Sequence, residues 1–144
     1  MISAARIVQT LGGPRVVRER AATYTAVVER VRAGLPYAAL EAVAARYEIP
    51  EETVIRLLHL PRRTLARRKK DGRLRPNESD RLLRLARIVA TAEDVLEDRD
   101  KAVAWLQRPN RALGGRRPLD MLDTDVGARE VEHVLGRIES GVYS

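Results

Sequence analysis

The chain has 144 residues, and 44% of them are apolar, which is enough for one domain or for two small domains that share a core. It contains no Cys, so disulfides and thiolate metal sites are excluded, and a reducing cytoplasm is the expected location. No apolar run reaches the roughly 18 residues that span a bilayer, and no secretory signal pattern is found, so we expect no membrane contact.

The amino-terminal half is predicted to be a series of short helices joined by turns. Apolar residues recur at helical spacing, while β-branched runs bounded by turn residues are missing. Gly12-Gly13-Pro14, Gly34 and Pro61 interrupt the pattern, because Gly ends helices and Pro cannot continue them. The pattern predicts an all-α fold, with helices in this half over residues 2–11, 23–33, 37–47, 50–58 and 62–70.

The carboxy-terminal half is predicted to begin with the longest helix, over about residues 78–97. Asn77 and Asp80 are spaced like a weak capping box at its start. Its apolar stripe is wider than one neighbour needs, which indicates either a central core helix or a dimer seam. A short helix over 102–107, a loop over 110–115, a turn or two over 118–122 and a last helix follow. Thr124 or Asp125 is expected to cap the last helix, and Gly141 to end it.

The charge of the chain is concentrated in one place. The 14 residues from Arg62 to Arg75 hold eight basic side chains and one acid, so their charge of +7 equals the net charge of the whole chain. Residues 50–72 have the shape of a helix-turn-helix unit, in which Leu65 packs the second helix against the first. The basic residues are expected to lie off that packing face and to contact DNA phosphates and base edges. The residues predicted to bind DNA are Arg62, Arg63, Thr64, Arg67, Arg68, Lys69, Lys70 and Arg73. The alternative is a solvated basic face on an ordinary three-helix core.

Residues with the potential for catalysis or metal binding are sparse. His59 and His133 lie far apart without ligand spacing, so both are expected at a surface or interface rather than on a metal. Asp120, Asp123 and Asp125 form an acidic cluster for which helix capping is the favoured role. No nucleophile elbow, P-loop or dinucleotide fingerprint is present. We therefore expect a protein that is not an enzyme and that needs no cofactor.

Three further features carry packing hypotheses. Trp105, the only Trp, is favoured as a core residue over an interface anchor. The pair Gly114-Gly115 permits a tight loop that docks on a partner, and Gly136 within the last helix would be explained by a close helix crossing. The alternative for the glycines is that they satisfy packing inside the chain.

Several short motifs resemble the Xre/MbcA/ParS family of antitoxins. In the carboxy-terminal half the motif residues are Trp105-Leu106, Arg108-Pro109-Asn110, Ala112-Leu113-Gly114-Gly115, Pro118-Leu119-Asp120 and Arg137 through Tyr143. Upstream, they are Leu65-Ala66-Arg67-Arg68, Gly72-Arg73-Leu74 and Glu78 through Leu82. The resemblance covers about residues 35–144. It implies a helix-turn-helix DNA-binding domain over 35–98 and a small helical toxin-binding domain over 99–144, with residues 1–34 left as poorly assigned helices.

The resemblance also implies partners. They are a RES-domain toxin that consumes NAD or transfers its ADP-ribose, the promoter DNA of the operon and a second copy of the chain. The residues expected to bind the toxin are Asn110, Arg111, Leu113, Gly114, Gly115, Gly141, Val142, Tyr143 and Ser144. The last three are expected to enter the toxin's pocket, with a carboxylate that pairs with an arginine there. The alternative is a frayed chain end without a function. The alternative function is that of a stand-alone helix-turn-helix regulator whose carboxy-terminal half only dimerises or senses a ligand.

Overall fold

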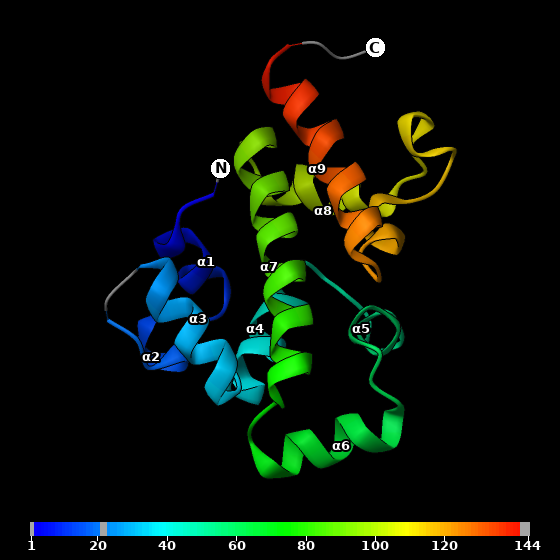
Figure 1. Cartoon of the computed structure of the whole chain (residues 1–144). Coiled ribbons are helices and arrows are strands. Elements are labelled where there is room, and N and C mark those ends of the chain that lie inside the picture. Colours follow the sequence, from blue (N-terminus) through cyan, green and yellow to red (C-terminus); the bar gives the residue numbers. More distant parts are fainter. Residues whose placement is uncertain (1, 21–22, 142–144) are drawn as a thin grey trace.

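A computed structural model describes residues 2–20 and 23–141, and within these ranges the chain folds into helices without a strand (Figure 1). This confirms the predicted all-α class. The α-helices are α1 (Ala4–Thr10), α2 (Pro14–Val17), α3 (Tyr24–Ala33), α4 (Tyr37–Arg46), α5 (Glu51–Leu58), α6 (Arg62–Asp71), α7 (Pro76–Leu96), α8 (Arg99–Gln107) and α9 (Asp125–Glu139). Two short 3₁₀ helices, η1 (Arg111–Leu113) and η2 (Pro118–Met121), lie between α8 and α9.

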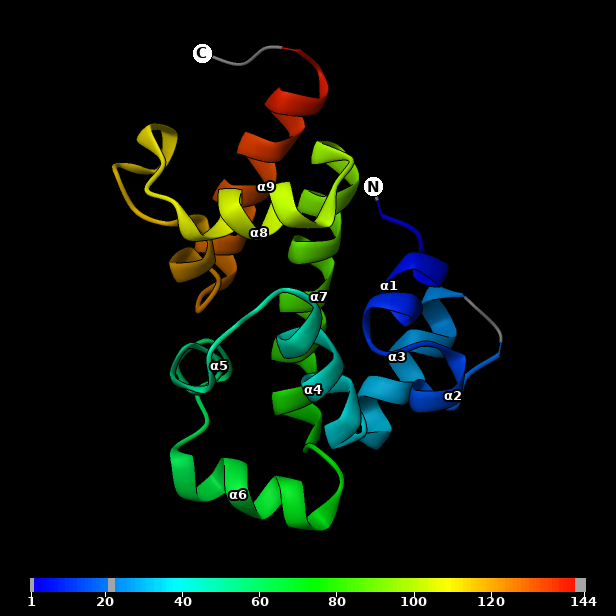
Figure 2. The ribbon, with the colours of Figure 1, turned by 180° about the vertical axis from the view of Figure 1, so that it is seen from behind.

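The longest helix, α7, is the axis around which the other helices pack. Helices α1 and α3 contact one flank of α7, α5 lies on the opposite flank near the start of α7, and α8 and α9 contact its carboxy-terminal part (Figures 1 and 2). Leu82, Ala86, Ile88 and Val89 are fully buried on α7. The wide apolar stripe is thus explained within one chain, because α7 has neighbours on several sides. This supports the core-helix interpretation.

The start of α7 differs from the prediction. Pro76 occupies the first turn, where its missing N–H removes no hydrogen bond, so the helix begins two residues earlier than expected. Glu78, rather than the predicted Asp80, reaches back to accept a hydrogen bond of 2.8 Å from the backbone N–H of Arg75. At α9 the prediction is confirmed, since the hydroxyl of Thr124 accepts a 2.9 Å hydrogen bond from Gly127 N–H.

The first helices are held to α7 by apolar packing and by an ionic cluster. Ile7, Val8 and Leu11 are buried. Arg6 forms an ion pair of 3.2 Å with Glu93 on α7, which also accepts a 2.7 Å hydrogen bond from the hydroxyl of Tyr47.

Glu93 is the centre of this cluster and is also paired with Arg46. Burial alone would raise the pKa of Glu93, but the hydrogen bonds from Arg46 and Tyr47 outweigh it and lower the pKa from 4.5 to about 2. Glu93 is therefore an anion that joins α1, α4 and α7.

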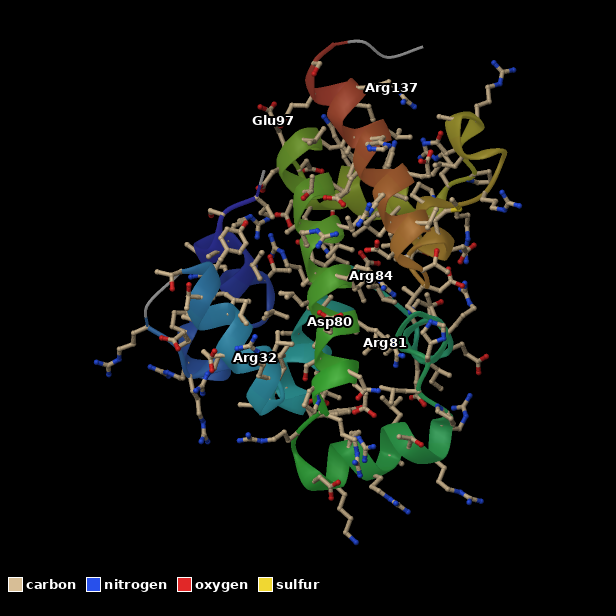
Figure 3. All side chains as sticks on the ribbon, in the orientation of Figure 1. Arg32, Asp80, Arg81, Arg84, Glu97 and Arg137 are labelled. Carbon is tan, nitrogen blue, oxygen red and sulfur yellow. The ribbon has the colours of Figure 1, made fainter. Side chains whose placement is uncertain are left out.

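Arginines on one side of α7 connect the two halves of the molecule. Arg81 donates a 3.3 Å hydrogen bond to the carbonyl of Leu58, the last residue of α5, and Arg84 donates a 3.3 Å bond to the carbonyl of Leu122 at the end of η2. Figure 3 labels both arginines along α7. Because helix carboxyl ends carry unpaired carbonyls and partial negative charge, these guanidinium groups stabilise both ends at once.

Candidate functional site

Helices α5 and α6 form the predicted helix-turn-helix unit. The turn between them contains His59 in the left-handed conformation, the buried Leu60 and then Pro61. Leu65 of α6 and Leu57 of α5 are both buried, which fixes α6 against the rest of the unit. Helix α6 lies at one end of the molecule, beyond the amino-terminal end of α7, and its outer side faces no other helix (Figures 1 and 2).

The outer side of α6 presents unpaired cations. Arg63, Arg67, Lys69 and Lys70 are exposed, and no hydrogen bond or ion pair from their side chains is found within the described ranges. Arg63, Arg67 and Lys70 follow a spacing of four and three residues, so they form one stripe along the helix. We call Arg63, Arg67, Lys69 and Lys70 the α6 cationic face.

Three other residues predicted to bind DNA differ in their surroundings. Arg62 is exposed but forms ion pairs with Glu51 at 3.1 Å and Glu52 at 2.7 Å, so its charge is already balanced. Thr64 is half-buried, and Arg73, beyond the helix, is exposed and donates a 3.1 Å hydrogen bond to the carbonyl of Ala33. Arg73 keeps further N–H groups for a partner, because a guanidinium has five.

The expectation that Arg68 lies off the packing face is wrong. Its side chain is only 8% exposed, and its Nε donates a 2.8 Å hydrogen bond to Glu78, whose side chain is 6% exposed. Arg68 follows Leu65 by three residues, so the two share the inward face of α6. Burial by itself would raise the pKa of Glu78, but the hydrogen bonds from Arg68 and from Arg75 N–H outweigh it and lower the pKa. Arg68 therefore anchors α6 to α7 and does not belong to the cationic face.

The α6 cationic face can bind a polyanion. Lys and Arg on an exposed helix attract phosphates over a distance, and Arg additionally fits the O6 and N7 acceptors of guanine in the major groove. The four side chains have no acidic neighbour within hydrogen-bonding distance among the described residues, so no internal ion pair has to break before they bind.

The predicted loop between α8 and α9 is a compact turn. Asn110 N–H donates a 3.0 Å hydrogen bond to the carbonyl of Arg116, and the side-chain oxygen of Asn110 accepts a 2.9 Å bond from Ala112 N–H. Gly114 and Gly115 have φ values of 67° and 83°, a region that favours glycine. The tight loop expected from this glycine pair is thus present.

The residues of this loop divide into two groups. Arg111, Gly114 and Gly115 are exposed, as a contact with a partner requires. Asn110 and Leu113 are 8% and 4% exposed, so their side chains are turned into the chain, against the expectation that they contact a toxin directly. Asn110 closes the turn by hydrogen bonds, and Leu113 attaches it to the core.

The last helix carries two contrasting glycines. A Cβ atom on Gly127 would lie 2.0 Å from the carbonyl oxygen of Met121, so this glycine is required for η2 to pack against α9. Gly136 is exposed, and a Cβ atom there would meet no described atom within 4 Å. The close helix crossing proposed for Gly136 is therefore not made within the described chain. Gly141 is exposed, while Val142, Tyr143 and Ser144 lie outside the described residues.

Trp105 and the two histidines contact other residues of the chain. Trp105 is half-buried and packs against the core. His59 is exposed with a ring nitrogen 2.8 Å from the carbonyl oxygen of Asp123, and His133 is exposed beside Glu130. In the described ranges no group of three His, Cys, Asp or Glu residues is arranged to hold a metal ion, and no helix is long and apolar enough to cross a membrane.

The capping role expected for the acidic cluster is wrong for Asp120. This residue accepts a 2.8 Å hydrogen bond from Arg117 and another of 2.8 Å from Arg56 on α5. The hydrogen bond from Arg117, with a smaller contribution from Arg56, lowers the pKa of Asp120. Asp120 thus joins the helix-turn-helix unit to the carboxy-terminal elements.

Two family models match the chain. The antitoxin Xre-like helix-turn-helix domain matches residues 26–87, and the antitoxin Xre/MbcA/ParS C-terminal toxin-binding domain matches residues 91–141. An antitoxin Xre of Yersinia enterocolitica is 35% identical over 122 residues, which cover 83% of this chain and 82% of the relative. An antitoxin Xre of Photorhabdus laumondii is 34% identical over 113 residues, 77% of this chain and 76% of the relative. A Prs ADP-ribosylating antitoxin of a Sphingobium species is 27% identical over 124 residues, 79% of this chain and 78% of the relative.

A helix-turn-helix unit followed by a helical toxin-binding domain defines the class of protein as a helix-turn-helix antitoxin. The chain belongs to the Xre antitoxin family, as the motif residues indicated.

Proposed function

We propose that this protein neutralises a cognate toxin with residues 99–144 and represses its own operon with residues 35–98. The observation that carries the proposal is the separation of the two candidate surfaces. The α6 cationic face lies at one end of α7, whereas α8, α9 and the loop around Gly114 lie toward the other end (Figures 1 and 2). Toxin and DNA can therefore be bound at the same time without competing for one surface.

For the toxin, we propose a RES-domain enzyme that degrades NAD or transfers its ADP-ribose. The motif resemblance supports this class, and a relative whose name contains ADP-ribosylation agrees with it. The contact surface would consist of the exposed loop residues Arg111, Gly114 and Gly115 together with Gly141 and residues 142–144. The last three would enter the active site and occlude it, so that NAD is excluded.

The exposed face of α9 around Gly136 is a second part of this toxin contact. A glycine in mid-helix costs about 1 kcal/mol relative to alanine, and here no contact within the described chain offsets that cost. Glu132, His133 and Gly136 line a shallow hollow there. A partner backbone that approaches closely would account for the missing side chain.

For DNA, we propose that the α6 cationic face enters the major groove of the promoter, with Arg73 on the flanking backbone. Two copies of the chain would place two α6 helices on half-sites one helical turn, about 34 Å, apart. The protein would act as such a homodimer in the cytoplasm. Binding should weaken steeply with salt, because each neutralised phosphate releases counterions.

The experiment uses two variants of the full chain that separate the two activities. Deletion of residues 142–144 should abolish protection of cells against the toxin encoded beside the antitoxin, while promoter binding persists. The double variant Arg63→Ala/Arg67→Ala should protect cells as the wild type does but should not shift the promoter in a gel.

Two results contradict the proposal. If the truncated chain protects fully, occlusion by the tail is wrong. If the wild-type chain neither associates with the neighbouring toxin nor protects from it, the antitoxin function fails and the stand-alone regulator is favoured.

A further inference from the structure

A basic pocket lies between the amino-terminal segment and the end of α6. It has a volume of about 360 Å³, far more than the roughly 30 Å³ that one water occupies. Four arginines line it, and Asp71 is the one acidic residue among its lining residues. The arginines come from three separate segments: Arg15 and Arg18 from α2 and its carboxyl end, Arg30 from α3, and Arg73 from the connection between α6 and α7.

Backbone hydrogen bonds hold the floor of the pocket in place. Tyr37 N–H donates a 3.0 Å bond to the carbonyl of Gly72, and Leu74 N–H donates a 2.8 Å bond to the carbonyl of Leu35. Gly34 makes this approach possible, because a Cβ atom there would lie 2.3 Å from the carbonyl oxygen of Leu74 and its φ is 95°. The two connections are thus fixed side by side, which positions Arg73 beside the arginines of α2 and α3.

Two of the four arginines in the pocket have no partner within the described residues, and the other two keep N–H groups that are not hydrogen-bonded: Arg73 donates one 3.1 Å bond to the carbonyl of Ala33. Within the described ranges, no hydrogen bond or ion pair is found from the side chains of Arg15 and Arg18, and both are exposed. Arg30 forms an ion pair of 3.9 Å with Glu19, but its Nε is buried and has no hydrogen-bond partner. A buried donor without an acceptor costs free energy, so an anion that enters the pocket would be stabilised by several guanidinium groups.

We propose that this pocket binds a backbone phosphate of the DNA duplex that the α6 cationic face contacts; the inference rests on the proposed DNA binding. The pocket adjoins the carboxyl end of α6, because Asp71 at the end of this helix and the following Gly72 and Arg73 are among its lining residues. Helix α2 lies on the flank of the molecule toward which α6 ends in both views (Figures 1 and 2). When α6 lies in the major groove, the DNA backbone continues past the carboxyl end of this helix. A phosphate of this flanking backbone would then lie in the pocket.

The proposal gives a function to residues outside both matched family regions. The helix-turn-helix match begins at residue 26, so Arg15 and Arg18 lie before it. Phosphate contacts fix the position of a protein on the duplex but do not read sequence. The amino-terminal segment therefore adds affinity and register to the DNA complex without changing which promoter is chosen.

The test compares two charge-matched double variants of the full chain. Arg15→Ala/Arg18→Ala removes two of the four arginines that line the pocket. The control, Arg108→Ala/Arg137→Ala, removes two exposed arginines from the carboxy-terminal half. Binding of a fluorescent promoter duplex and of a scrambled duplex is measured by anisotropy at several salt concentrations. Melting by circular dichroism verifies that both variants stay folded. Arg18→Gly is a second variant, because Arg18 has a φ of 62° that glycine adopts without strain.

We expect the pocket variant to bind both duplexes at least about tenfold more weakly, with an unchanged ratio between them. The slope of log K against log salt should become shallower by about one, as for one lost phosphate contact. A neutral methylphosphonate at the flanking phosphate should weaken the wild type but not the pocket variant.

Equal affinity and equal salt slope for the wild type and the pocket variant would overturn the phosphate site while leaving DNA binding by α6 intact. A loss of binding in the carboxy-terminal control as large as in the pocket variant would also overturn it. If the wild type binds neither duplex, the proposed DNA binding itself fails, and the inference falls with it.

Discussion

Adjacent arginines on α6 are expected to give opposite phenotypes when they are replaced. Arg67 is exposed on the cationic face, whereas Arg68 is buried against Glu78. Arg67→Ala should weaken DNA binding and leave stability within about 0.5 kcal/mol of the wild type. Arg68→Met should lower stability strongly, because it leaves the Glu78 carboxylate buried without its cation.

The structure sets the size of the Arg68 effect. Both side chains are less than a tenth exposed and 2.8 Å apart, and the loss of one partner from such a buried pair costs about 3–5 kcal/mol. The free energy of unfolding of a whole protein is about 5–15 kcal/mol, so the variant should melt roughly 10–20 °C below the wild type. Glu78 still accepts the hydrogen bond from Arg75 N–H, which keeps the start of α7 capped. The double variant Arg68→Met/Glu78→Gln removes both charges, retains an acceptor for that N–H and should recover most of the loss.

The pH dependence gives this prediction a second readout. In the wild type the pKa of Glu78 is lowered, so the pair stabilises the fold above the ordinary carboxyl pKa and is lost as pH falls through the lowered value. In the Arg68→Met variant, burial dominates and the pKa of Glu78 rises. The loss in free energy of unfolding is therefore largest near pH 7, where Glu78 is charged, and shrinks as the pH falls. Urea unfolding at several pH values, monitored by the fluorescence of Trp105, measures this pH dependence of stability. Equal stability of the Arg67→Ala and Arg68→Met variants at pH 7 would refute the role of the buried pair.

Two further predictions concern stability alone. The ionised Glu93 should contribute roughly 3 kcal/mol to the free energy of unfolding, because folding lowers its pKa from 4.5 to about 2. This contribution is present above about pH 5 and is lost as the pH falls to about 2. The Glu93→Gln variant should lack this part of the acid dependence when thermal melting is measured against pH. Gly136→Ala should raise the free energy of unfolding by about 0.5–1 kcal/mol, because alanine has the higher helix propensity and its Cβ atom would meet no described atom. Gly127→Ala should lower the free energy of unfolding, because its Cβ atom would overlap the Met121 carbonyl. Chemical denaturation of the two variants measures both changes.

The helices themselves were predictable because Gly and Pro mark their ends. Helices α3, α4 and α6 begin and end within one residue of the predicted bounds. The Gly-Gly-Pro pattern predicts only the end of the first helix at Pro14, but proline is also favoured in a first turn, where it starts α2. Helix α8 begins three residues before the predicted start, because the carboxylate of Asp98 caps it by a 2.8 Å bond from Lys101 N–H.

The contacts within the candidate site could not be predicted in the same way. The charge pattern of α6 does not show whether Arg68 faces water or a carboxylate ten residues further along the chain. The predicted exposed position of Arg68 is wrong for this reason. The spacing of three residues between Leu65 and Arg68 does indicate the buried position, because residues three apart share a helix face. Arg15 and Arg18 lie in a segment without a recognisable motif, and only the tertiary fold brings them beside Arg73.

The position of α7 explains how one small chain holds two binding surfaces in a fixed relation. A helix of 21 residues is about 30 Å long, so its ends are separated by roughly the diameter of a small domain. Without polar contacts, α5 and η2 would each be positioned only by packing, with no direct bond between them. Arg81 and Arg84 bind the carbonyl ends of these two elements, while Asp120 binds Arg56 across the space between them. Arg81 joins α7 to the helix-turn-helix unit, and Arg84 joins α7 to η2, so displacement of either element would leave a partly buried guanidinium group without its acceptor. The α6 cationic face and the loop around Gly114 are therefore held in one rigid relation rather than on two independently moving domains.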